Sequence, residues 1–215
     1  MALTLLAVSV GAAALLTFAT PVVTPAQAET GIYLLDRAAS AVDFTISASK
    51  IFTIKKTGEF TEFTGQLSFD PKDPASTNVD LTVYTSSIDI HNAQNNQLLK
   101  SGAFFDVEHF PTMRFMSSST AVKPDGTFSV TGDMTIRGIT RRMTIPVTLR
   151  QSQQTASPSG AVFESTFEID RTMFGLNGHV DTPGFNVSIS KKVQIHIAIA
   201  ARPEASAFPS GSLAR

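Results

Sequence analysis

The sequence predicts an all-β protein built from antiparallel strands. Apolar and polar residues alternate in several runs of the chain, a period of two that marks strands with one buried face. Turn-forming residues separate these runs, and helical periodicity is confined to one short segment. Many sequential strands joined by short turns indicate a sandwich or a barrel.

The strands can be read in chain order from this alternation. In the first run, Val42, Phe44, Ile46 and Ala48 share one side, and polar residues occupy the other. The same pattern predicts roughly eight or more strands in total. The later runs lie at residues 79–83, 128–136, 143–149, 163–169 and 193–199.

Turns and one helix account for the segments between the strands. Turn signals occur at DPKDP (residues 70–74), at KPDG (residues 123–126) and at Arg137-Gly138. The segment NAQNNQLLKS (residues 92–101) is expected to be the helix, with Gly102 as its C-cap.

The aromatic composition bears on what the strands enclose. The chain has 16 Phe but only 2 Tyr and no Trp. Phe offers a large apolar surface without a polar group, which favours a barrel whose interior suits a hydrocarbon ligand. The same residues could instead simply fill a core. Alternation also fits an outer-membrane barrel, although the Tyr and Trp girdles of that class are absent here.

The first 28 residues predict an export signal. They carry no charged side chain, and they end with small residues at Ala26 and Ala28, an A-x-A cleavage signature. We expect cleavage after Ala28, with a retained membrane anchor as the alternative. Residues 29–201 then form one domain, and the polar tail at residues 202–215 is expected to be disordered.

Several classes of function are disfavoured by what the chain lacks. Its formal net charge of −1 gives no broad basic field for nucleic acid. It has no Cys, which excludes thiol catalysis and Cys–metal sites. His91, His109, His179 and His196 show no metal-ligand spacing, and no nucleophile-elbow or phosphate-binding motif occurs. We therefore predict no enzyme, no metal and no cofactor.

Several phrases together resemble one known family. They are KSGAFFDVEHFPTMRF (residues 100–115), TGDMTIRGITRRMTIPVTL (residues 131–149), GEF…FTG…FDP between residues 58 and 71, and DRTMFG (residues 170–175). Their order resembles the YceI-like family from about residue 33 to about residue 201. The resemblance implies an exported, eight-stranded antiparallel β-barrel of lipocalin-like shape in the periplasm.

The resemblance also implies a function. Such barrels hold polyisoprenoids or other long amphiphiles, including quinone-like lipids, and they are not known as enzymes. We therefore expect an isoprenoid, quinone or fatty ligand carried for transport or storage. A structural or stress-response protein with a filled barrel and a lipid-acting hydrolase are the alternatives. A transient membrane contact and a homodimer remain open.

The departures from the family pattern concern polar groups. Ala39-Ser40 replaces a usual His-Ser pair, Ala48 replaces a second His, and Asn95-Asn96 stand where an Arg-Asp pair is typical. Amides can hydrogen-bond a quinone or a hydroxyl, but they bind a pyrophosphate less well than charged groups do. We infer a neutral head group, such as a quinone ring, an amide or a fatty chain.

Two sets of residues are the candidate ligand contacts. Asn95, Asn96, Arg137 and Arg171 are expected near the head group. The dibasic pairs at residues 55–56, 141–142 and 191–192 are usually solvated, but at a barrel mouth they could contact anionic lipid. The expected barrel lining is Phe44, Ile46, Phe60, Phe63, Leu67, Phe69, Phe104, Phe105, Phe115, Met134, Ile136, Phe167 and Phe174.

Overall fold

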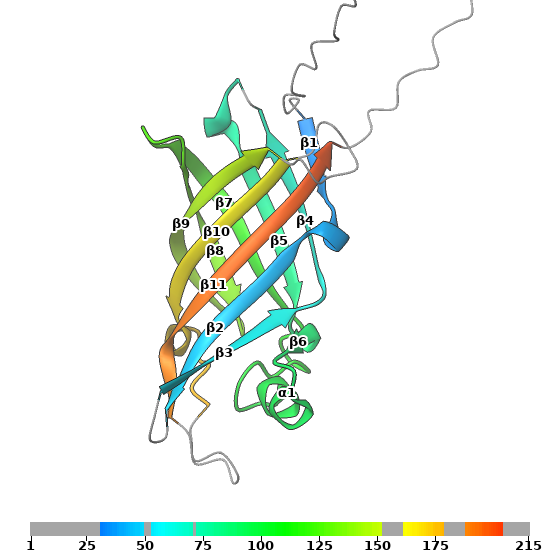
Figure 1. Cartoon of the computed structure of the whole chain (residues 1–215), viewed down its shortest axis with the longest axis vertical. Helices are drawn as coiled ribbons and strands as arrows, with labels where there is room; N and C mark the ends of the chain where they lie inside the picture. Colours follow the sequence, from blue (N-terminus) through cyan, green and yellow to red (C-terminus); the bar gives the residue numbers. More distant parts are fainter. Residues whose placement is uncertain (1–30, 50–52, 71, 152–160, 179–187, 204–215) are drawn as a thin grey trace, which may run out of the picture.

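The computed structural model describes residues 31–49, 53–70, 72–151, 161–178 and 188–203 (Figure 1). The strands are β1 (Gly31–Leu35), β2 (Ala41–Ser49), β3 (Thr53–Phe60), β4 (Phe63–Phe69), β5 (Asn78–Tyr84), β6 (Ile88–Asp89), β7 (Thr112–Val122), β8 (Phe128–Ile136), β9 (Ile139–Gln151), β10 (Ala161–Asp170) and β11 (Ser188–Pro203). The helices are α1 (Ala93–Lys100) and the 3₁₀ helices η1 (Arg37–Ala39), η2 (Pro74–Ser76), η3 (Thr85–Ser87) and η4 (Arg171–Phe174).

The strands close into one antiparallel barrel. The sheet order is β1-β4-β5-β7-β8-β9-β10-β11-β2-β3-β6, and β1 also pairs with β11. Both β1 and β2 pair with β11, while β1 pairs with β4 and β2 with β3. We therefore treat β1–β2 as one interrupted strand and β3–β4 as another, which gives eight strands around the barrel. Over the described residues, the predicted eight-stranded antiparallel barrel with one short α-helix is confirmed.

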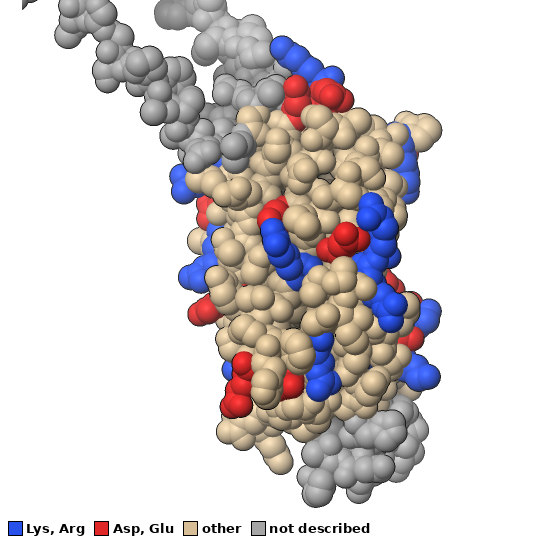
Figure 2. All heavy atoms as spheres, turned by 180° about the vertical axis from the view of Figure 1, so that it is seen from behind, with Lys and Arg blue, Asp and Glu red and all other residues tan. Residues whose placement is uncertain are grey.

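The apolar side of each alternating run faces the barrel interior. Val42, Phe44 and Ala48 are buried on β2, and Val130 and Ile136 are buried on β8. Polar side chains cover the outside, where Lys and Arg are interspersed with Asp and Glu on the face seen in Figure 2. The interior is thus apolar and the surface carries no broad field of one sign on that face.

One end of the barrel is closed by the strands' own side chains, and we call it the sealed end. Tyr33 is 0% exposed and Phe69 is 2% exposed. The Phe69 ring lies edge-on to those of Tyr33, Phe128 and Phe163, with ring centroids 6.2, 6.4 and 5.4 Å apart. The other members of this core cluster are Leu67, Phe115, Val130, Ile145, Ala161 and Ala201.

The opposite end, which we call the capped end, is covered by elements other than strands. These are α1, the loop at residues 101–111, and η4 with residues 175–178 (Figure 1). Asn92 caps α1 by accepting a hydrogen bond from the Asn95 amide at 2.9 Å. Of the helices in the described part of the chain, none is long and apolar enough to cross a bilayer.

The C-cap of α1 differs from the prediction. Ser101, not Gly102, is the cap, with extended backbone angles of φ −70° and ψ 168°. Its hydroxyl donates to the Leu98 carbonyl at 2.7 Å, and its amide donates to the Gln97 and Leu98 carbonyls. The helix therefore ends without the left-handed residue that a glycine would supply.

One predicted turn is present in the structure, and one predicted boundary lies elsewhere. Arg137 and Gly138 form the two-residue turn between β8 and β9, with φ of 48° and 71°. The disordered tail is predicted to start at residue 202. That start is too early, because Arg202 and Pro203 pair with Leu34 and Tyr33 in the barrel. The expected signal at residues 1–28 and the rest of the tail lie outside the described residues.

Candidate functional site

The barrel encloses a cavity of about 190 Å³. Its wall is made chiefly of aliphatic and aromatic side chains from both halves of the barrel. Two hydroxyl residues in the wall are satisfied by the backbone, since Ser165 donates to the Pro146 carbonyl at 2.6 Å and Thr77 donates to the Pro74 carbonyl at 2.7 Å. An interior of this kind favours an apolar ligand.

Most of the expected lining residues border this cavity, and three do not. Phe69 belongs to the packed cluster of the sealed end. Phe63 and Phe174 are buried in another core cluster of the barrel. Phe63 begins β4, and Phe174 lies in η4 beyond the end of β10, so neither sits along the wall of the cavity. The ten that border it are Phe44, Ile46, Phe60, Leu67, Phe104, Phe105, Phe115, Met134, Ile136 and Phe167.

Part of the cavity wall lies outside the predicted lining, because aromatic residues dominated that prediction. Strand β11 contributes Ile195, Ile197 and Ile199 to the cavity, and β5 contributes Leu81 and Val83. The alternation of apolar and polar residues that predicts these strands also predicts which of their side chains face the interior. A selection of every inward-facing position would have found them.

The loop at residues 101–111 packs its aromatic rings against the barrel end. Phe104 is 4% exposed and borders the cavity. A Cβ at Gly178 would lie 2.3 Å from the Phe104 ring, so the missing side chain there makes room for it. Phe105 lies edge-on to Phe60, with ring centroids 5.7 Å apart. The paired phenylalanines therefore form part of the cover over the cavity.

A group of polar side chains holds this cover, and we call it the polar clasp: Arg137, Asp106 and His109. The Arg137 guanidinium donates to the Gly102 and Gly175 carbonyls, each at 2.7 Å, and lies 3.9 Å from the Asp106 carboxylate. Asp106 in turn bonds the His109 Nδ1 at 2.8 Å. This hydrogen bond, with the carboxylate charge, raises the pKa of His109. The clasp thus joins the loop, the β8–β9 turn and the segment after η4.

Arg171 places a positive charge in the cavity wall at the capped end. Its side chain is buried and donates to the Ser190 carbonyl at 3.0 Å, the Ile189 carbonyl at 3.3 Å and the Leu176 carbonyl. Burial lowers the pKa of Arg171, but a guanidinium stays protonated at neutral pH. Three of its five N–H donors are used in this way, and the other two have no partner among the hydrogen bonds of the described residues.

The other three expected head-group residues do not border the cavity. Asn96 fastens α1 to β6, since its Nδ2 donates to Asp89 at 2.8 Å and its Oδ1 accepts from the Ile90 amide at 2.9 Å. Asn95 lies half-buried on α1, and Arg137 belongs to the polar clasp. The amide side chain of Asn96 therefore has a structural partner that the helix sequence alone did not reveal.

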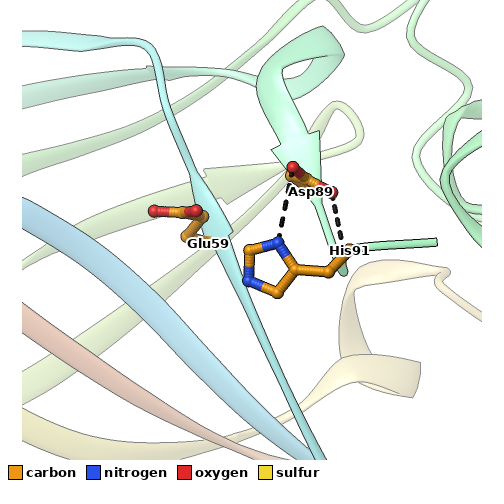
Figure 3. A group of neighbouring side chains, drawn as sticks. All are labelled: Glu59, Asp89 and His91. Carbon is orange, nitrogen blue, oxygen red and sulfur yellow. Dashed lines mark hydrogen bonds and ion pairs between the residues drawn. The ribbon is translucent and has the colours of Figure 1, made fainter. Parts of the chain in front are cut away.

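Strand pairing brings three cation-binding residue types together on the outside of the barrel (Figure 3). Glu59 pairs with Asp89 across β3 and β6, and ligand atoms of these two and His91 lie within 4.8 Å of one another. The His91 Nδ1 is 3.7 Å from Asp89. However, one Asp89 oxygen already accepts from Asn96 and the His91 amide, which lowers the pKa of Asp89. In Figure 3 the dashed contacts join Asp89 and His91, and none of them reaches Glu59.

This barrel has relatives among known proteins. The sequence profile of the YceI-like domain matches residues 33–201, which is most of the chain. The chain belongs to the YceI-like domain family. One relative, a UPF0312 protein of Shewanella denitrificans, is 28% identical over 163 residues, which cover 75% of this chain and 85% of the relative. A UPF0312 protein of Vibrio parahaemolyticus is 33% identical over 123 residues, covering 56% of this chain and 64% of the relative.

Solved structures share the YceI-like barrel. The crystal structure of BcnA from Burkholderia cenocepacia has a TM-score of 0.67 and 26% sequence identity, with 78% of this chain and 99% of BcnA covered. A polyisoprenoid binding domain from Saccharophagus degradans has a TM-score of 0.64 at 16% identity, covering 80% of this chain and 98% of that domain. At that identity, the second likeness concerns the fold alone.

Proposed function

We propose that this protein is an exported, periplasmic binding protein that holds one polyisoprenoid or quinone-like amphiphile inside the barrel, for transport or storage. The observation that carries the proposal is the apolar cavity of about 190 Å³ inside the barrel. The shared fold with a structure described as a polyisoprenoid binding domain supports the same ligand class. We propose a binding role and not a catalytic one.

Apolar burial would supply most of the affinity. Transfer of apolar surface from water is worth about 25 cal/mol per Å², so a long prenyl chain needs few polar contacts. The wall contains the adaptable side chains Met113 and Met134 as well as the isoleucines of β11. We propose that the chain of the ligand lies along this wall.

We propose that Arg171 contacts the head group. Of the four expected head-group residues it alone borders the cavity, and it has two N–H donors without a partner among the hydrogen bonds described above. A quinone carbonyl or an alcohol oxygen can accept from them. Three backbone carbonyls already accept hydrogen bonds from the guanidinium. It therefore needs no anionic partner, and a neutral acceptor on the ligand can bind its other N–H groups. Much tighter binding of a prenyl pyrophosphate than of the neutral prenol would contradict this assignment.

A pair of substitutions on β11 tests the cavity as the binding site. Ile195 borders the cavity, while its neighbour Gln194 is exposed on the outer face. Ile195→Trp should remove most of the binding capacity for a ubiquinone-type lipid, whereas Gln194→Trp should leave it unchanged. Bound lipid can be measured by organic extraction after gel filtration, with thermal unfolding as a check on the fold.

The outcomes separate the alternatives. Equal lipid binding by both folded variants would contradict binding in the cavity. A wild-type protein that never takes up lipid would favour a filled barrel with a structural or stress-response role. Hydrolysis is less well supported, because no His borders the cavity in the described part of the chain and the hydroxyl of Ser165 is bonded to the backbone. A turnover screen with ester and prenyl substrates tests it directly.

A further inference from the structure

The capped end carries a group of exposed cationic and apolar side chains beside the cavity. The start of β3 supplies Ile54, Lys55 and Lys56, the start of β11 supplies Lys191, and η4 supplies Met173. We call these five residues the basic rim. Strand β2 separates β3 from β11, and Figure 1 shows the starts of β3 and β11 at the same lower end of the barrel.

Hydrogen bonds and strand register place the rim elements together. Ala48 of β2 pairs with Ile54 on one side and with Ile189 on the other. The Arg171 guanidinium donates to the Ile189 and Ser190 carbonyls, which fixes η4 beside the start of β11. Lys191 follows directly on this contact, so all three elements meet at one end.

The rim adjoins the cavity wall. Lys56 pairs with Ile46, and Ile46 and Ile189 both border the cavity. Ile54 and Lys56 therefore stand on the inward-facing side of β3, the side that carries buried residues further along the strand. Both are nevertheless exposed, because this part of β3 extends past the packed interior. A surface that contacts the rim would lie close to the cavity.

The lysines of the rim are free to meet an external anion. Lys55, Lys56 and Lys191 are exposed, and none forms an ion pair with another described residue, although the charge of Lys191 helps to lower the pKa of Asp170. The neighbouring Lys192 is different, since it pairs with Glu168 at 2.7 Å. The rim also carries two protruding apolar side chains.

These apolar side chains are Ile54, which is 50% exposed, and Met173, which is 52% exposed. Among the large hydrophobic side chains of the described residues, these are the two most exposed. Cations next to exposed apolar side chains match the two layers of a membrane surface, in which anionic head groups cover hydrocarbon. We propose that the basic rim docks the capped end of the barrel onto a membrane that contains anionic lipid.

The test is co-sedimentation with lipid vesicles. Phosphatidylcholine vesicles with and without phosphatidylglycerol contain no isoprenoid or quinone, so the result does not depend on the proposed cargo. The chain from Glu29 onward is suitable, because every described element of the barrel lies between Gly31 and Pro203. We expect binding to the anionic vesicles that weakens as salt is raised.

A triple substitution at the rim has a matched control at the other end. Lys55→Gln, Lys56→Gln and Lys191→Gln together should weaken partitioning onto anionic vesicles by about a hundredfold, or about fivefold for each lysine. Lys72→Gln, Lys123→Gln and Arg202→Gln change the net charge equally at exposed positions of the sealed end and should leave partitioning within about twofold of that for the parent protein. Equal losses in both variants, or no preference of the parent protein for anionic vesicles, would overturn the proposal.

The apolar pair provides a second comparison. Ile54→Gln with Met173→Gln should weaken vesicle binding severalfold. Met116→Gln with Val122→Gln should not, although these side chains are each 47% exposed on another part of the surface. Unchanged binding by the Ile54–Met173 variant would contradict apolar insertion by the rim.

Discussion

The two ends of the barrel are closed in different ways. At the sealed end, strand residues such as Tyr33 and Phe69 pack edge to face and are almost completely buried. At the capped end, a helix and a loop cover the cavity, and polar contacts of Arg137 hold the loop to the segment after η4. The sealed end is therefore part of the core that the barrel needs to fold. The capped end also contains buried side chains such as Phe174, but its helix and loop lie outside the strand ladder, so we expect it to open locally more readily than the sealed end.

The largest expected difference comes from removing one aromatic ring at each end. Phe69→Ala removes a ring that contacts three others and should lower the free energy of unfolding by about 3–5 kcal/mol. Phe105→Ala should cost clearly less, because Phe105 is only half-buried. Urea denaturation measures both. Equal losses would show that the two ends contribute alike to the core.

A smaller effect is expected where the loop meets the barrel. Gly178→Ala puts a methyl group against the Phe104 ring and should cost about 1–3 kcal/mol through displacement of that ring. It should also speed the release of a bound lipid. Gly102→Ala is the matched control, because a Cβ there meets only Asp106 atoms at 4.0 Å. If both variants release lipid at the same rate as the parent protein, the loop does not control access.

The smallest effect concerns the polar clasp and its dependence on pH. The Asp106 hydrogen bond raises the pKa of His109, so it favours the protonated imidazole in the folded state. This contribution is fully present below the ordinary His pKa of about 6.5 and is lost as the pH rises through the raised value. Hydrogen exchange of the amides at residues 102–110 should therefore be faster above that value, after correction for the intrinsic pH dependence of exchange.

Asp106→Asn tests the cause of this pKa change. Asn tolerates the positive φ of 49° at this position, so the backbone of the loop should be preserved. The pKa of His109, followed by NMR titration, should fall toward its ordinary value, with little change in the free energy of unfolding. A pKa of His109 that stays raised in this variant would assign the shift to a different group.

The sealed end was more predictable from the sequence than the capped end. Period-two alternation predicts which side of each strand is buried. At the capped end, the Arg137-Gly138 turn also follows from local chemistry. The capped end depends on partners far apart in the chain, such as Phe104 with Gly178. No local pattern shows that Asn96 binds Asp89 instead of facing the cavity. For Arg171, burial and contact with three carbonyls follow from how η4 folds back on β11.

Native mass spectrometry of the protein, purified from its own host without detergent, tests the central claim most directly. We predict a discrete bound mass that organic solvent releases, and its value would identify a quinone, a prenol or a fatty ligand. An apo mass that persists after incubation with ubiquinone and prenyl lipids would contradict the proposal that the barrel holds a lipid.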